Sequence, residues 1–114
     1  MATVFFLILG ILVTLSAIYD FMGPAALKAD MVRFGYRPGF EKILGVIKIA
    51  GAWGLFWGLA THLMGVTASL AFVVYFVLAI RVHKKVNDPL AKAMPAVVFL
   101  GISIASLVAG LMSL

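Results

Sequence analysis

The sequence predicts an all-α fold: one domain, residues 1–114, in which four transmembrane helices form a bundle and a short interfacial helix lies between the first and second spans. Hydrophobic residues make up 65% of the chain and charged residues only 11%, with a mean hydropathy of +1.20. Soluble domains carry about 25% charged residues, so this composition indicates an integral membrane protein. Four stretches approach the roughly 20 helical residues that a bilayer core of about 30 Å requires.

The four predicted spans are separated by two longer loops and one tight turn. Along the chain they run over Ala2 to Met22, Ile43 to Leu63, Met64 to Ile80, and Ala93 to Leu114. Because the third stretch is short and Gly65 is the only turn-forming residue before it, we expect the second and third spans to form a hairpin. No basic residue precedes the first span, so we expect a retained helix and no cleaved signal peptide.

The loop between the first and second spans has a helical pattern of its own. Gly23 and Pro24 end the first span, and proline suits the first turn of a new helix. Apolar residues then recur at i, i+4 and i+7, with charged residues on the opposite face: Leu27, Met31 and Phe34 against Lys28, Asp30 and Arg33. This pattern is typical of a short helix that lies in the membrane surface.

The second loop contains a signal for the start of the last helix. Asp88 and Pro89 are predicted to be its N-cap and its first helical residue. The last helix is therefore expected to start in the headgroup region, before its apolar stretch enters the hydrocarbon.

The basic residues are predicted to lie on one side of the bundle. All nine are in or beside the two longer loops: Lys28, Arg33, Arg37, Lys42 and Lys48 at the first, and Arg81, Lys84, Lys85 and Lys92 at the second. With four spans these loops share one side, and the positive-inside rule predicts that they are cytoplasmic and that both termini are non-cytoplasmic. The predicted partner is therefore the lipid bilayer, and nucleic acid is the weaker explanation of the net charge of +5.

Lys48 is an ammonium inside an otherwise apolar span. A charge at mid-membrane costs roughly 2.5 to 3.5 kcal/mol, so it needs a partner or a route to the interface. If Glu41 and Lys42 mark the membrane edge, Lys48 is six residues in and about 9 Å deep, and Asp20, counted from Gly23, is about 5 Å deep. The aliphatic part of a lysine side chain is long enough to span this difference in depth. Three interpretations stay open: both side chains snorkel to the interface, they form a structural ion pair, or they take part in chemistry.

The two histidines and the lack of cysteine limit the cofactors that one subunit can hold. His62 and His83 are 21 residues apart, about 31 Å of helix, so they cannot together ligate one haem or metal ion. A Cys-ligated cofactor is excluded, no metal site is predicted, and the cofactor stays unknown. His83 is expected at headgroup level or, alternatively, as a proton donor or acceptor facing the bundle. His62 is expected in the turn, with no role.

Two rows of small residues are spaced for close helix packing. They are Ala50, Gly54 and Gly58 in the second span, and Gly101, Ala105 and Ala109 in the fourth. Small residues four apart let helix backbones approach closely in lipid. Three hydroxyls inside spans are weak markers, because each can return its hydrogen bond to its own helix: those of Tyr75, Ser103 and Ser106.

Several short motifs follow one another in the order found in one family of membrane proteins. Ser16 to Pro24 is similar to the end of that family's first helix, and Leu44 to Ala52 to its second helix. Phe34-Gly35-Tyr36 matches its turn, while His83, Asp88-Pro89 and Pro95-Ala96 match its third loop. The chain thereby resembles the DoxX-like family of small four-helix membrane proteins over most of its length.

The chain departs from the family pattern at two charged positions. Members typically carry a lysine where this chain has Asp20, and a glutamate where it has Lys48. Exchanging both charges preserves their attraction, whereas exchanging one creates a like-charge pair. The paired inversion favours the structural ion pair over snorkelling and argues against a carboxylate base in the second span.

The resemblance implies only a general function. Members are linked to quinol oxidation, thiosulfate oxidation or oxidative-stress responses, so we expect a small inner-membrane, redox-associated or accessory subunit. Its candidate polar pocket lies on the cytoplasmic side and comprises Asp20, Lys48, His83, Tyr19 and Arg81. A quinone or another apolar small molecule is the possible ligand, and a homo-oligomer or a larger membrane complex the possible assembly.

Two alternative functions stay open. The first is a small proton-coupled transporter with Asp20 as its coupling carboxylate, although Asp20 lies near the end of its helix and the first loop is long for that architecture. The second is a membrane isomerase or hydrolase that uses Asp20 or His83 as acid or base on an apolar substrate. Such a role depends first on the geometry of the site, which the sequence does not supply.

Overall fold

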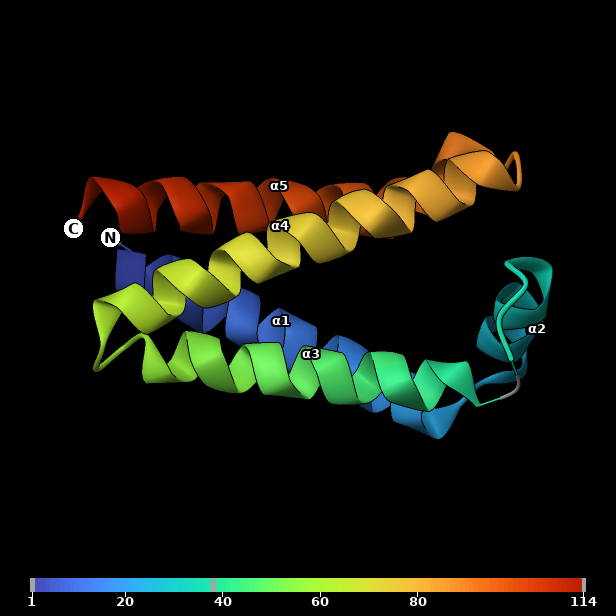
Figure 1. Ribbon diagram of the computed structural model, residues 1–114, viewed down its shortest axis with the longest axis horizontal. Helices are drawn as coiled ribbons and strands as arrows, with labels where there is room; N and C mark the ends of the chain where they lie inside the picture. Colours follow the sequence, from blue (N-terminus) through green and yellow to red (C-terminus); the bar gives the residue numbers. More distant parts are fainter. Residues whose placement is uncertain (1, 38, 114) are drawn as a thin grey trace.

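The computed structural model describes residues 2–37 and 39–113, and this part of the chain is all-α, as predicted. Its five helices are α1 (Ala2–Met22), α2 (Ala25–Arg33), α3 (Phe40–Trp57), α4 (His62–Lys85) and α5 (Leu90–Met112) (Figure 1). Three of them, α1, α4 and α5, are long and apolar enough to cross a membrane. The 18 residues of α3 are also largely apolar but include Glu41, Lys42 and Lys48.

The long helices pack as two pairs, α1 with α3 and α4 with α5, and the pairs meet along α3–α4 and α1–α5. Both termini and the α3–α4 turn lie at one end of the molecule (Figure 1). At the other end the two pairs separate, and α2 lies near the opening between them, beside the α4–α5 loop (Figure 1). The fold thus has a closed end and an end that α2 covers.

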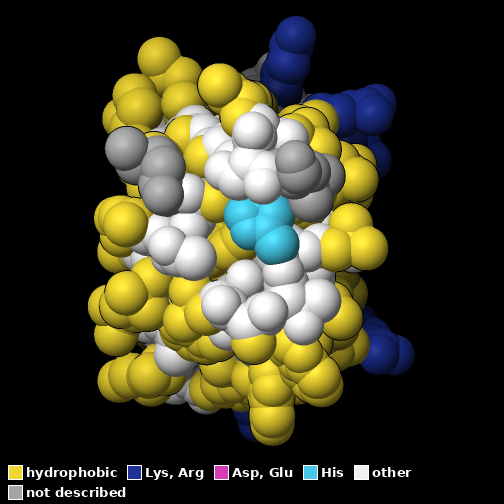
Figure 2. All heavy atoms as spheres, turned by 90° about the vertical axis from the view of Figure 1, so that its left-hand side faces the viewer, with side chains coloured by type: hydrophobic (Ala, Val, Ile, Leu, Met, Phe, Trp, Pro, Cys, Tyr) yellow, Lys and Arg dark blue, Asp and Glu magenta, His cyan; other side chains and the backbone are white. Residues whose placement is uncertain are grey.

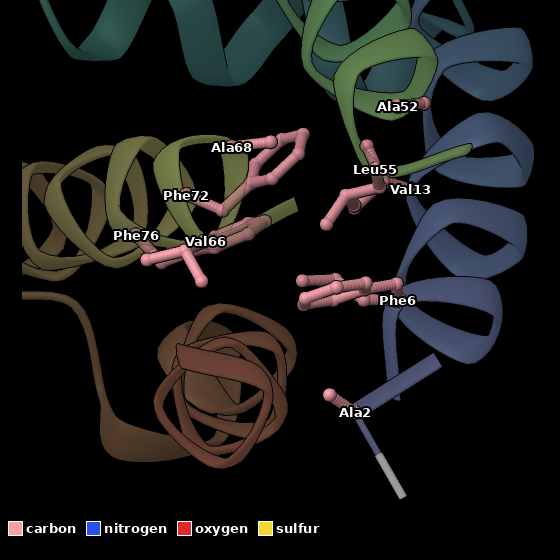
Figure 3. Packing of buried hydrophobic residues seen from close by; sticks show 10 residues of the cluster. Ala2, Phe6, Val13, Ala52, Leu55, Val66, Ala68, Phe72 and Phe76 are labelled. Carbon is pink, nitrogen blue, oxygen red and sulfur yellow. The ribbon is translucent and has the colours of Figure 1, made fainter. Parts of the chain in front are cut away.

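The closed end contains the apolar core. Phe6, Leu9 and Val13 of α1 and Leu55 of α3 are fully buried. They meet α4 at Phe72 and its neighbours, so side chains fill the space between the two helix pairs (Figure 3). Between α4 and α5 the buried hydroxyls of Ser69 and Ser106 lie 2.6 Å apart and share a hydrogen bond. This interhelical bond was not anticipated from the sequence, where Ser106 was expected to bond within its own helix.

The α3–α4 hairpin turns earlier than predicted. Helix α3 ends at Trp57 and α4 begins at His62, so the turn does not lie at Gly65. Gly65 is buried inside α4, where a Cβ built on Gly58 would lie only 2.5 Å from its Cα. Gly65 is therefore needed for the close approach of two helix backbones, a role that sequence alone does not distinguish from a turn. The last helix starts at Leu90, one residue after the predicted first helical residue Pro89 and three residues before the apolar span predicted from Ala93.

The small residues do not all face a neighbouring helix. Gly54 and Gly58 lie against α4, but Ala50 is exposed and Gly51 instead approaches the ring of Phe72. On α5, Gly101 is exposed and a Cβ there would meet no atom within 4 Å. The buried positions of that helix are Ala93, Ser103, Ser106 and Gly110, whereas Ala105 and Ala109 are half-buried. Two of the three residues of the α3 row thus contact α4, whereas the α5 row is turned partly outward, with Gly101 exposed and Ala105 and Ala109 half-buried.

His62 has a structural partner that the sequence did not reveal. Its Nε2 lies 2.8 Å from the carbonyl oxygen of Gly110, to which it donates, and its ring packs against Phe6 at 5.4 Å between centroids. Figure 2 shows the end face that carries the termini, with a histidine at its centre and hydrophobic side chains around the periphery. His62 thus ties the start of α4 to the end of α5.

Candidate functional site

The antiparallel α3–α4 pair changes character halfway along its length. From the turn inward the facing residues are small on α3 and pair in a regular register: Gly58 with Gly65, Gly54 with Ala68, and Gly51 with Phe72. The next facing pair is Lys48 and Tyr75, whose ammonium and ring centroid are 5.8 Å apart. Beyond it α3 presents Leu44 and Phe40. Large side chains therefore replace glycine at the level where the helices separate.

A cavity of about 290 Å³ opens at this level, beneath α2. Aromatic residues form much of its wall: Phe34, Tyr36, Phe40 and Tyr75. Four ionisable side chains also line it: Asp20, Asp30, Lys48 and His83. The volume is at the lower end of the roughly 300 to 1,000 Å³ of small-molecule sites, so the cavity suits a small molecule or a ring-sized head group.

Lys48 lies on the wall that α1 and α3 form. Its Nζ is 2.8 Å from Oδ2 of Asp20 and donates a hydrogen bond of 2.8 Å to the hydroxyl of Ser16. Both charged residues are buried, with Asp20 3% and Lys48 8% exposed. An ammonium has three N–H donors, and among the described residues the structure gives this one two oxygen partners. Among the described residues Lys48 thus has no third oxygen partner, and its side chain lines the cavity.

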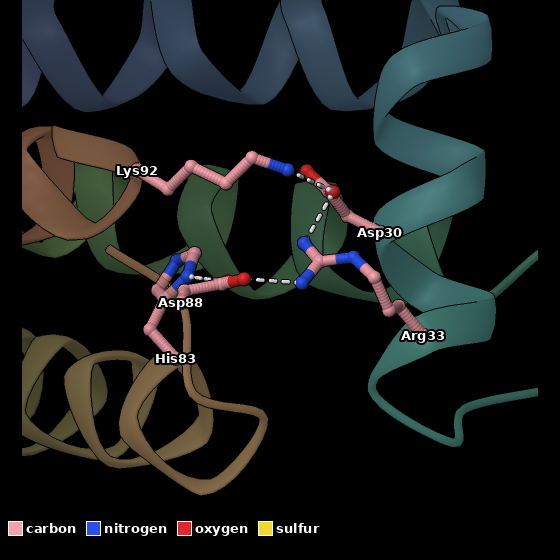
Figure 4. A network of polar contacts seen from close by, with 5 residues as sticks. All are labelled: Asp30, Arg33, His83, Asp88 and Lys92. Atoms are coloured by element: carbon pink, nitrogen blue, oxygen red, sulfur yellow. Dashed lines mark hydrogen bonds and ion pairs between the residues drawn. The ribbon is translucent and has the colours of Figure 1, made fainter. Parts of the chain in front are cut away.

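A second polar cluster closes the α2 end of the cavity. Arg33 on α2 donates to Asp30 at 2.7 Å and to the carboxylate of Asp88, whose other oxygen lies 2.7 Å from Nδ1 of His83 (Figure 4). Lys92 adds a longer contact of 4.0 Å to Asp30. These contacts join α2 to the α4–α5 loop. We call these five residues the α2 network: Asp30, Arg33, His83, Asp88 and Lys92.

The carboxylate of Asp88 is the centre of the α2 network. Its side chain is only 4% exposed. Hydrogen bonds from Arg33 and then from His83 stabilise its charged form and lower its pKa below the ordinary 3.8, while the bonds to Asp88 and Asp30 raise the pKa of Arg33. The prediction that Asp88 is an N-cap is wrong: α5 starts after Pro89, and no side chain caps it. Asp88 is occupied by Arg33 and His83 instead.

The structure brings together three of the five predicted pocket residues. Asp20, Lys48 and His83 line the cavity, whereas Tyr19 is half-exposed and Arg81 is exposed, both outside it. Tyr19 directly precedes Asp20 on α1, and adjacent helical residues point about 100° apart, which turns its ring away from the site.

Four residues of the site were missed from the sequence: Tyr75 and Asp30, which line the cavity, and Ser16 and Asp88, which contact Lys48 and His83. Ser16 precedes Asp20 by four residues and so shares its helix face, a signal that was present in the sequence. Tyr75 and Asp30 join the site only through the packing of separate helices, whereas Asp88 follows His83 by five residues in the α4–α5 loop. Within residues 2–37 and 39–113, no three His, Cys, Asp or Glu side chains are grouped to hold a metal ion.

Comparison with known proteins supports one assignment. No curated protein and no solved structure matches the chain. The family model described as the DoxX-like family matches residues 4–106, nearly the whole chain, and includes both the Asp20–Lys48 pair and the α2 network. Together with three helices long and apolar enough to cross a membrane, this match places the protein in the membrane. The chain belongs to the DoxX-like family.

Proposed function

We propose that four helices span the inner membrane, with α3 as the fourth span and α2 at the cytoplasmic surface. The 18 residues of α3 extend about 27 Å, close to the thickness of a bilayer core. Its one deep charge, Lys48, is compensated by Asp20. The basic loops then lie in the cytoplasm and both termini on the opposite side, in line with the positive-inside rule.

The cavity is proposed to bind the ring of a quinone or of a similar lipid-soluble carbonyl compound, which makes the protein a redox-associated or accessory membrane subunit. The observation that carries this proposal is the third N–H of Lys48, which is available at an aromatic-walled cavity. A carbonyl oxygen is the acceptor that such a donor requires, and aromatic walls favour a flat ring by stacking or edge contacts.

The charges around Lys48 favour a neutral ligand over an anion. Asp20 already neutralises the ammonium, and Asp30 lines the same cavity. An anionic ligand would enter a site with no net positive charge beside its binding donor, and burying an unpaired charge is costly. A neutral carbonyl pays no such cost and still accepts a hydrogen bond from a charged donor, which is stronger than a neutral one.

Equilibrium binding of a decyl-tailed benzoquinone to protein in lipid nanodiscs tests this proposal. Lys48→Met in an Asp20→Asn background removes the donor without leaving a buried unpaired carboxylate, and we expect at least tenfold weaker binding. Lys42→Met, which removes an exposed lysine of the same helix, is the matched control and should leave the affinity unchanged. Equal affinity in wild type and the double variant would contradict the proposed role of Lys48.

A second candidate, an isomerase or hydrolase for an apolar substrate, has one observation in its favour. His83 lines the cavity, and Asp88 holds its Nδ1 at 2.7 Å, an arrangement that orients an imidazole for acid–base chemistry. Turnover of a lipid, sterol or epoxide that disappears in His83→Gln would support this function. A proton-coupled transporter gains no such support, because the fully buried core of Phe6, Leu9 and Leu55 lies between the cavity and the opposite end.

A further inference from the structure

We infer that the ligand enters the cavity sideways from the bilayer, between α3 and α4 at Leu78, and does not enter from water past α2. This inference rests on the proposed function, because it concerns the path to the same cavity. Its basis is that two ends of the cavity are closed and one side is open.

The end that faces the cytoplasm is closed by α2 and its contacts. Met31 of α2 is 5% exposed, and the ring of Phe34 packs edge-on against His83 at 5.2 Å between centroids. Above them the α2 network joins α2 to the α4–α5 loop through charged hydrogen bonds (Figure 4). The side chains of Asp88 and His83 are only 4% and 18% exposed, so the inner half of the network is closed, while Arg33 and Asp30, 35% and 33% exposed, form its outer edge.

The end that faces the termini is closed by the apolar core. Leu55 on α3 is fully buried and Phe72 on α4 is 2% exposed. The ring of Phe72 fills the space beside Gly51. Gly51 is about one helical turn from Lys48, in the direction of the α3–α4 loop. The cavity therefore has no continuation along the bundle axis in that direction.

The side between α3 and α4 is open. Leu78 lines the cavity and is nevertheless 53% exposed, whereas the other lining residues are buried or half-buried. A residue with one side in the cavity and the other on the surface marks a rim. Two further apolar lining residues, Leu44 on α3 and Ala79 on α4, are half-buried and extend this rim on the α3–α4 side.

The surface around this rim is apolar and close to the headgroup level. Val74 and Val77, on the outside of α4, are 53% and 40% exposed. Leu78 lies three residues before Arg81 and six before Lys84, about 5 and 9 Å along the helix. In a four-span arrangement the opening thus faces hydrocarbon just below the cytoplasmic headgroups, where basic residues anchor helix ends.

The position of the opening defines the ligand class more narrowly. A molecule that partitions into the bilayer places a polar ring near the headgroups, passes Leu78 with its ring first, and leaves its tail in the lipid. Lys48 is the facing residue one turn deeper, opposite Tyr75, and its available donor meets the ring oxygen. A lipid-dissolved compound with a tail is therefore favoured over the same ring dissolved in water, and α2 need not move.

The first test measures where Leu78 lies, without any ligand. In a Trp53→Phe, Trp57→Phe background, the Leu78→Trp protein in nanodiscs should lose fluorescence with brominated phospholipid and little with aqueous acrylamide. A protein that retains native Trp53, 67% exposed, is the lipid-facing control, and Phe76→Trp, at a site 4% exposed, is the buried control. Strong acrylamide quenching, or none by brominated lipid, would overturn the lateral opening.

The second test measures binding rates of the decyl-tailed benzoquinone, with Phe40→Trp as the quenched reporter in the same tryptophan-free background. Leu78→Phe narrows the rim and should slow association and dissociation at least threefold each, with the dissociation constant changed less than twofold. Val77→Phe, the exposed neighbour outside the cavity, should change neither rate. Loosening α2 with Arg33→Ala should also leave both rates unchanged.

The outcomes separate this inference from the proposed function. Rates that respond to Arg33→Ala and not to Leu78→Phe would show that the ligand comes from water and would overturn the inference while keeping the ligand. No quinone binding by wild type, combined with lipid quenching at Leu78, would reject the proposed ligand and support the opening.

Discussion

The ammonium of Lys48 on α3 lies 2.8 Å from the carboxylate of Asp20 on α1, and both side chains are buried in the half of the protein where the helix pairs separate. The two residues are 28 positions apart in the chain. Their contact joins α1 to α3 and also leaves one donor of Lys48 for the cavity. The structural role and the proposed binding role therefore fall on the same side chain.

Exchanging the charges of this pair should preserve the fold. Asp20→Lys alone and Lys48→Glu alone each create a buried like-charge pair, and removing the attraction from a buried pair typically costs about 3 to 5 kcal/mol. We expect both single variants to unfold at clearly lower temperature in detergent and the double exchange to recover most of the loss. Lys42→Glu, at an exposed site on the same helix, should change stability by about 0.5 kcal/mol or less. Additive effects of the two exchanges would show that the pair is not coupled.

The α2 network should weaken in acid because of Asp88. Hydrogen bonds from Arg33 and His83 hold the folded-state pKa of Asp88 below the ordinary 3.8, so its stabilising contribution is complete above about pH 3.8 and is lost as the pH falls through the folded value. Thermal unfolding between pH 7 and pH 3 should show a smaller acid loss in Asp88→Asn, together with lower stability at pH 7. Lys84→Gln, exposed and outside the network, is the control. If Asp88→Asn loses as much stability between pH 7 and pH 3 as the wild type, groups other than Asp88 cause the acid destabilisation.

The α3–α4 contact should tolerate no added methyl group at Gly58. A Cβ there would lie 2.5 Å from the Cα of Gly65, a backbone atom that cannot rotate away. We expect Gly58→Ala to cost about 1 to 3 kcal/mol, as overpacking usually does. Gly101→Ala is the matched control, because its Cβ meets no atom within 4 Å and alanine is the better helix former. The thermal unfolding temperatures of the two variants test this prediction. Equal stability of both would mean that α3 and α4 can move apart to accommodate a methyl group at Gly58.

The Ser69–Ser106 hydrogen bond should show measurable coupling between α4 and α5. Both side chains are fully buried and their oxygens are 2.6 Å apart, so replacing either one leaves a hydroxyl without its partner. A double-mutant cycle with Ser69→Ala and Ser106→Ala should give a coupling of about 0.6 kcal/mol, the average for interhelical hydrogen bonds in membrane proteins. Thr67→Ala, whose exposed hydroxyl bonds to Leu63 within its own helix, is the control and should show no coupling to Ser106→Ala.

The proposed four spans predict which loops meet the outside of the cell. The chain contains no cysteine, so single-cysteine variants report one position each. Ala60→Cys, in the exposed α3–α4 turn, should react with an impermeant maleimide in intact cells, whereas Lys84→Cys should react only after the membrane is opened. The same labelling of both positions in intact cells would contradict α4 as a span, and the reverse pattern would invert the orientation.

The charges that form the Asp20–Lys48 pair could be recognised from the sequence because depth along a helix is a local property. Counting residues from the loops placed both side chains less than one helical turn apart in depth, and the inverted family pattern favoured their pairing. Ser16 was also within reach of this reasoning, since it shares the face of Asp20. The role of Asp88 could not be predicted in this way. An Asp-Pro pair signals the start of a helix, but here the Asp88 carboxylate accepts a hydrogen bond from Arg33, 55 residues away in the chain.

The sequence by itself determined the class of the protein: an all-α membrane chain, its apolar helices, the helical segment now called α2, and the family. The tertiary structure decided which side of each helix faces inward, and thereby that Gly51 and not Ala50 meets α4, that Tyr75 faces Lys48, and that Leu78 lines a cavity beneath α2. The physical reason is that lipid, and not water, surrounds the helices. Lipid-facing and inward-facing surfaces are both apolar, so hydrophobic periodicity carries little information about helix rotation, and only the close packing of all helices together selects it.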